Sequence, residues 1–281
     1  MSVDAEKIVT KVLKVASLPE VVIKFDEAIK NPLTSNNQLE KILSEDSALA
    51  SKVLRIANSA LYNFPSKIDT ILNAISIVGH KQLNDIILSC SVVSMFKDLP
   101  QDVIDMDMFW RHSLSVATAS RILASSRREQ NIEKFFTAGL LHDIGKLIMF
   151  SEIPSKVSEV LQSCSESNES MYRVEQDIIG FDHAKLGSML MQKWKLPNEV
   201  TTAVNYHHNP SSSKGDVVTA SIIHIADIIS HSLQLGSSGQ LLVPKLNNKA
   251  WDVLGLDVEI IGAVIEQLNV QYNDAVKYIL N

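Results

Sequence analysis

The sequence has little cysteine and no segment typical of secretion or of a membrane span. Its two cysteines, Cys90 and Cys164, form no CxxC pair and no disulfide framework, which favours a reducing compartment. The opening residues, MSVDAEKIVT, lack the basic and apolar regions of a secretory signal. The longest apolar stretch, residues 217–235, carries two histidines and an aspartate, so we expect a buried helix there. We therefore expect a cytoplasmic protein that does not contact a membrane.

An excess of basic residues is also missing. The formal net charge is −6, which argues against a broad binding surface for nucleic acid and favours proteins or small molecules as partners. Sustained alternation of apolar and polar residues is nearly absent, whereas apolar residues recur at helical spacing along the chain. Hydrophobic residues make up 46% of the 281 residues, enough for a substantial core. The sequence predicts an all-α protein.

The chain divides at a polar, acidic segment, KDLPQDVIDMD, over residues 97–107. We predict an N-terminal helical domain over residues 1–100 and a second helical domain, with nearly all the histidines, over 101–281. Residues 44–47 are expected to separate two helices, with Asp46 or Ser47 as the N-cap of the second. Further helices are predicted at 4–15, 19–30, 68–78, 81–97, 107–127, 131–150, 153–166, 168–179, 183–195, 197–208, 216–235, 257–269 and 271–280.

The stretch TAGLLHDIGKLIMF, residues 137–150, places His142, Asp143 and Lys146 within an apolar run. A bare carboxylate is costly to bury, and the same question arises for Asp227 in its apolar helix. Several other histidines fall at predicted helix ends or beside another residue able to bind a metal. The candidate ligands are His112, His142, Asp143, His183, His207, His208 and Asp227.

Two divalent cations would explain these residues together. Nitrogen and oxygen ligands without sulfur suit iron, manganese or zinc, and seven protein ligands exceed what one ion normally takes. Adjacent residues of a helix point about 100° apart. Asp143 is therefore expected to bridge two ions while His142 serves one of them.

Lys146 follows Asp143 by three residues and His142 by four, which places it on their side of a continuous helix. Its ammonium group can hold an anionic substrate oxygen beside the metals. Two metals would lower the pKa of a shared water toward neutrality and supply a nucleophile. The pattern thus points to metal-assisted hydrolysis of a phosphoester, with Asp143 and Lys146 as the catalytic residues.

Structural roles for the same residues are the alternative. A buried histidine often has ordinary hydrogen-bond partners, and His183 and His207 could interact with helix ends. His224 and His231 lie three residues before and four after Asp227 on one helical face, so they could support the ligands from outside or be solvated.

The motifs HDIGK, WRHS, HAKLG, HH and HIAD resemble the HD superfamily of metal-dependent phosphohydrolases. The segments SLPEVVIKFDEAI, ILSEDSALASKVLRIANSALY and AISIVGHKQLNDIIL narrow this to the HDOD family, the bacterial regulatory branch of that superfamily. The resemblance covers residues 17–235 and implies an N-terminal helical bundle packed on an HD-type metal-binding domain.

Carried over from the related HD-GYP phosphodiesterases, the metal ligands fall on the seven residues named above and the substrate lysine on Lys146. The chain departs from those enzymes after the paired histidines, where it has HHNPSSSKGD in place of a Gly-Tyr-Pro loop. Met108 stands where some of them have a glutamate for a third metal, so the resemblance implies two ions.

Two functions follow as expectations. One is hydrolysis of a phosphorylated small molecule, such as a nucleotide, by a binuclear metal site. The other is a non-catalytic, metal-binding regulatory module that binds a signalling protein, as the HDOD resemblance suggests. No nucleic-acid partner is expected in either case.

Overall fold

The computed structural model of the chain describes residues 3–13, 17–62, 64, 67–96, 104–167, 169–240 and 242–280. Helices and their connections account for all of these residues, and none of them is in a β-strand. The prediction of an all-α fold is confirmed. Among the described residues, none of the helices combines the length and the apolar character needed to span a bilayer.

Contacts group the chain into two compact units. Unit 1 comprises residues 1–17 and 98–268, and unit 2 comprises residues 18–97 and 269–281. The predicted domain boundary at residues 100 and 101 lies outside the described residues. The helix α16, Ile260–Ile279, contributes residues to both units.

The described residues of unit 2 form five helices besides its part of α16: α2 Glu20–Lys30, α3 Asn36–Ser44, α4 Ser47–Ala57, α5 Ile71–Val78 and α6 His80–Met95. Its fully buried side chains include Phe25, Leu39 and Leu83, from α2, α3 and α6. Asp46 is the N-cap of α4, because its side chain accepts a hydrogen bond from the backbone N–H of Leu49 at 2.9 Å. The sequence had left the choice between Asp46 and Ser47 open.

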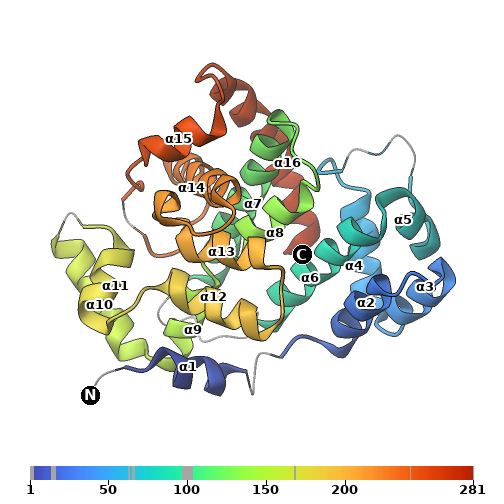
Figure 1. Cartoon of the computed structure of the whole chain (residues 1–281), viewed down its shortest axis with the longest axis horizontal. Coiled ribbons are helices and arrows are strands. Elements are labelled where there is room, and N and C mark those ends of the chain that lie inside the picture. The colour runs from blue at the N-terminus through green and yellow to red at the C-terminus, as the bar shows by residue number, and fades with distance from the viewer. Residues whose placement is uncertain are drawn as a thin grey trace. The chain divides into compact units, whose positions relative to one another are not determined.

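Unit 1 contains the histidine-rich segment. Its helices are α1 Ala5–Val12, α7 Met106–Ser126, α8 Glu133–Leu141, α9 Ile144–Glu152, α10 Pro154–Glu166, α11 Met171–Ile179, α12 His183–Lys193, α13 Asn198–Tyr206, a short 3₁₀ helix Pro210–Ser212, α14 Val217–Ser232 and α15 Asn248–Leu254. The helix α7 packs against α8 and α14, and α12 packs against α9 and α13 (Figure 1). These four helix pairs pack together within unit 1.

The stretch 131–150 is two helices, and the prediction of one continuous helix is wrong. The first helix ends at Leu141 and the second begins at Ile144, so His142 and Asp143 form the junction between them. Asp143 has φ −99° and ψ 7°, outside helical geometry. The apolar pattern continues through the junction without Pro, so helical periodicity alone contains no sign of the break.

The C-terminal region also differs from the prediction. The predicted helices 257–269 and 271–280 are one helix, α16. The helix α15 was not predicted. It is short, and its N-cap is Asn247, whose side chain accepts a hydrogen bond from the N–H of Ala250. It ends at Gly255, which has φ +59°.

Candidate metal centre

The centre of unit 1 brings together all seven predicted ligands. His112 lies within α7 and Asp227 within α14. The other five lie at helix ends, where a cap or a junction fixes the side chain. His183, for example, is the first residue of α12 because Asp182 caps that helix by accepting from the N–H of Lys185 at 2.8 Å. Three groups of possible ligand atoms result, each with its atoms within 4.8 Å of one another: His183, His207 and His208; His112, Asp227 and His231; and His112, His142 and Asp143. The last two groups share His112.

The carboxylate of Asp143 lies between two sets of side chains. Its Oδ1 is 3.0 Å from Nε2 of His183 and 4.0 Å from Nε2 of His207. Its Oδ2 is 3.3 Å from Nε2 of His142 and 2.8 Å from Nζ of Lys146. The two oxygens therefore face different imidazoles, which is the arrangement that a bridging carboxylate needs.

Asp227 provides the second carboxylate of the cluster. Its Oδ1 is 3.1 Å from Nε2 of His112, 3.8 Å from Nε2 of His142 and 2.9 Å from Nδ1 of His231. His142 thus lies within 4 Å of both carboxylates. Its ring therefore connects the side chains around Asp143 with those around Asp227.

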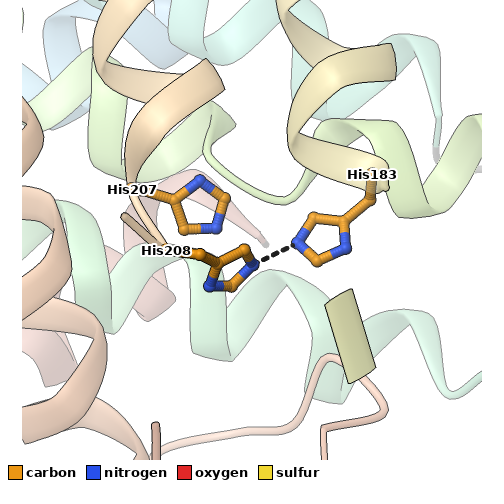
Figure 2. A group of neighbouring side chains, drawn as sticks. All are labelled: His183, His207 and His208. Carbon is orange, nitrogen blue, oxygen red and sulfur yellow. Dashed lines mark hydrogen bonds between the residues drawn. The ribbon is translucent and has the colours of Figure 1, made fainter. Parts of the chain in front are cut away.

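The third group consists of histidines alone (Figure 2). Nε2 of His208 lies 2.8 Å from Nε2 of His183, and the rings of His207 and His208 have their centroids 3.9 Å apart. Two imidazole lone pairs repel each other at such a distance unless a proton or a cation lies between them. A proton on His183, or a cation shared by the three rings, would satisfy both nitrogens.

Several buried atoms of the cluster have no hydrogen-bond partner of suitable geometry among the described residues. They are both ring nitrogens of His112, Nε2 of His142, His207 and His231, and Oδ1 of Asp143 and Asp227. A buried polar atom without a partner costs about 1–3 kcal/mol. Nε2 of His112, His142 and His207 each lies within 4.0 Å of Oδ1 of Asp143 or Asp227, and these are nitrogen and oxygen donors of the type that iron, manganese and zinc accept. The residues present fit divalent cations.

Hydrogen bonds from the opposite ring nitrogens orient the imidazoles. Nδ1 of His142 lies 2.7 Å from the carbonyl oxygen of Gly139, and Nδ1 of His207 lies 2.7 Å from that of Val204. An Nδ1–H group that donates to a carbonyl leaves the lone pair on Nε2, which is the usual tautomer of a metal-binding histidine.

Glu175 supplies the corresponding contact for His183. Its Oε2 lies 2.6 Å from Nδ1 of His183 and also accepts the backbone N–H of that residue at 2.9 Å. Glu175 lies on α11 and is 1% exposed. Sequence reasoning missed it, because a single glutamate in an amphipathic helix has no local sign of burial.

The pKa values of the cluster follow from burial and from the two carboxylates. Burial lowers the pKa of His112 to about 4 and that of His207 to about 3. Burial also acts on His183, but the negative charges of Glu175 and Asp143 outweigh it and raise its pKa to about 9. At neutral pH His112 and His207 therefore offer free lone pairs, whereas His183 carries a proton that a cation would replace.

Lys146 is buried beside Asp143, at 2% exposure. Its Nζ donates to Oδ2 of Asp143 at 2.8 Å and to Oγ of Ser238 at 2.9 Å. The loop that contains Ser238 packs closely on α7, since a Cβ on Gly236 (φ +82°) would lie 2.2 Å from the backbone nitrogen of His112. Ser238 is a second contact that the sequence did not reveal, because it lies 92 residues from Lys146.

His208 connects the cluster with the surface. It is part-exposed, and the ring of Tyr172 stacks on it with a centroid distance of 4.4 Å and an interplanar angle of 12°. His208 lines an open hollow of about 790 Å³, together with Tyr172, Arg173, Lys185 and Tyr206 among others. The charged side chains that line this hollow are the cationic Arg173 and Lys185 and the anionic Asp182.

The fold and this cluster define an all-α protein with a buried site of imidazoles and carboxylates. The family profile described as the HDOD domain matches residues 15–210. The chain belongs to the HDOD domain family, and the resemblance drawn from its motifs is confirmed.

Three relatives illustrate the similarity. The crystal structure of an HDOD domain protein of unknown function from Geobacter sulfurreducens is 23% identical, with a TM-score of 0.79 over 98% of each chain. That of a candidate phosphohydrolase from Shewanella amazonensis SB2B is 22% identical, with a TM-score of 0.75 over 99% of this chain and 98% of that one. An uncharacterised protein of Treponema pallidum (strain Nichols) is 23% identical over 206 residues, which are 73% of this chain and 40% of that protein. The chain thus spans less than half the length of this curated relative.

Proposed function

We propose that the chain is a metal-dependent phosphohydrolase that cleaves a phosphoester of a small molecule, for example a nucleotide. The observation that carries the proposal is the convergence of buried nitrogen and oxygen atoms that have no hydrogen-bond partner among the described residues. Two divalent cations, iron, manganese or zinc, would be held by His112, His142, Asp143, His183, His207, His208 and Asp227. The phosphohydrolase name of the Shewanella protein supports the same class of reaction.

When bound, the cations would polarise a phosphoryl oxygen and lower the pKa of water toward neutrality. Lys146 would exchange its bond to Ser238 for a bond to a phosphate oxygen while it keeps Asp143 as its counter-ion. Glu175 would keep the ring of His183 in one orientation throughout. Tyr172 would restrict access of water at His208, because its ring covers that imidazole.

A metal-binding regulatory module is the second candidate function, and the burial of Lys146 favours it. The ammonium group is 2% exposed and already has two partners, Asp143 and Ser238. A site that only held metal would need no open route to this group. In this case the chain would act on a signalling protein through its surface.

Metal analysis and a hydrolysis assay test both candidates. The protein is stripped with a chelator and reloaded separately with iron, manganese or zinc, and metal per chain is measured by mass spectrometry. Turnover is then assayed on phosphomonoesters, nucleotides and cyclic dinucleotides. Asp143→Asn is compared with Asp216→Asn, a control that alters a carboxylate which caps α14 and lies outside the ligand groups.

If the chain is a phosphohydrolase, we expect two ions per chain and a loss of turnover of more than about 100-fold in Asp143→Asn. Mutation of a residue that only contacts a metal ligand already lowers metal affinity or activity by about 10–100-fold. Asp216→Asn should retain both properties. Metal binding without turnover on any substrate would favour the regulatory module. A wild-type protein that binds no divalent cation would refute both.

A further inference from the structure

His231 lies beside the predicted ligands and shares their environment. It is four residues after Asp227 on α14, and its side chain is 10% exposed. Nδ1 of His231 is 2.9 Å from Oδ1 of Asp227, and its ring centroid is 4.4 Å from that of His112. One ring nitrogen of His231 thus belongs to a group of possible ligand atoms with His112 and Asp227.

The surroundings of His231 resemble those of the predicted ligands in part. Its Nδ1 lies 3.1 Å from the carbonyl oxygen of Asp227, as Nδ1 of His142 and His207 lie near carbonyls of their own helices. Its Nε2 is buried and without a hydrogen-bond partner in the described part of the chain, but the nitrogen beside a carboxylate is Nδ1 in His231 and Nε2 in His142 and His207. In either tautomer one nitrogen of this ring is therefore left unsatisfied.

His224, on the same helix, differs from His231 in its hydrogen bonds. Its Nδ1 lies 2.8 Å from the carbonyl oxygen of His207, and its Nε2 accepts the backbone N–H of Asn247 at 3.0 Å. Both of its ring nitrogens have partners, and it belongs to none of the possible ligand groups found among the described residues. Two histidines seven residues apart, on one face of α14, thus differ in whether a nitrogen remains available.

We propose that His231 is a metal ligand, completing with His112 and Asp227 the site of one cation. This proposal rests on the metal site proposed above and adds a residue to it. The group of His112, Asp227 and His231 shares no residue with the group of His183, His207 and His208. One cation in each group gives a binuclear site, with Asp143 and His142 between the two positions.

The test compares His231→Gln with His224→Gln, which is the same change on the same helix. Both variants and the wild type are stripped and reloaded with Co²⁺. Metal per chain, the dissociation constant from competition with a chelator, and the visible absorption of the bound Co²⁺ are then measured. His231→Asn serves as a second variant, and circular dichroism of the stripped proteins checks that each is folded.

We expect His231→Gln and His231→Asn to bind one of the two ions at least about 10-fold more weakly, with an altered Co²⁺ spectrum. His224→Gln should bind both ions as the wild type does. If folded His231 variants retain two ions with wild-type affinity and spectrum, His231 is not a ligand, and the proposed metal site stands without it. If the wild type itself binds no Co²⁺, both proposals fail together.

Discussion

Gly145 is the position at which an added methyl group should disturb the geometry of the site most. It lies in α9, two residues after Asp143, where α9 meets α12. A Cβ at Gly145 would lie 1.9 Å from the carbonyl oxygen of His183 and 2.8 Å from the backbone nitrogen of Gly187. Both atoms belong to backbone, so no side chain can rotate away. Gly145→Ala must therefore displace α9 from the start of α12 by at least about 1 Å to restore an allowed contact.

This displacement has two measurable consequences. Overpacking of this kind costs about 3 kcal/mol of unfolding free energy, equivalent to a fall in Tm of roughly 6–12 °C for a chain of this size. The shift also separates Nε2 of His183 from Oδ1 of Asp143, now 3.0 Å apart, so metal content should fall as well.

The matched control is Gly262→Ala, since Gly262 lies in the helix α16 and a Cβ there would have no neighbour within 4 Å. This change should raise stability by about 0.5–1 kcal/mol, because alanine favours the helix more than glycine does. Thermal unfolding followed by circular dichroism, with metal analysis of the same samples, measures both variants. If Gly145→Ala unfolds at the wild-type temperature and keeps its metal, the close approach of the two helices is not as described.

Three further predictions concern single interactions. Glu175→Gln should weaken metal binding by about 10–100-fold, because it removes the charge that orients His183; an unchanged chelator titration would contradict this. In the metal-free protein, burial holds the pKa of His112 at about 4 and that of His207 at about 3, below the unfolded value of about 6.5. The unfolded state therefore binds more protons as the pH falls below about 6.5, and Tm measured with chelator should drop between pH 6.5 and pH 4; a constant Tm would disprove it. Asp46→Ala removes the N-cap of α4 and should cost about 1 kcal/mol in a denaturant titration, whereas Asp46→Asn should cost little.

The fold class and the members of the cluster could be predicted from the sequence for separate reasons. Apolar residues at helical spacing require only local information, so most helices of the chain were found. The residues of the cluster were singled out because Asp143 and Asp227 lie in apolar surroundings, where a carboxylate needs compensation. That they meet in space came from the family resemblance and not from periodicity.

The errors arose where distant parts of the chain decide local structure. The break at His142 and Asp143 lies where α9 packs against α12, with Gly145 and Gly187 at the close approach of the two helices. No local signal marks it, because a helix through this stretch would show the same apolar spacing. Glu175 and Ser238 were missed for the same reason. Glu175 contacts His183 and Ser238 contacts Lys146 only in the folded chain.

The charge of the site would connect the proposed metal binding with the choice of substrate. Asp143, Asp227 and Glu175 provide three carboxylates against one ammonium group from Lys146, a formal charge of −2 when the imidazoles are neutral. This excess explains why His183, at a pKa of about 9, keeps a proton despite its burial. The two proposed cations would replace that proton and change the formal charge to +2, which suits a phosphate dianion in a buried site. Phosphate should therefore bind only after the cations, so inorganic phosphate should protect the metal-loaded protein against heat and leave the stripped protein unaffected.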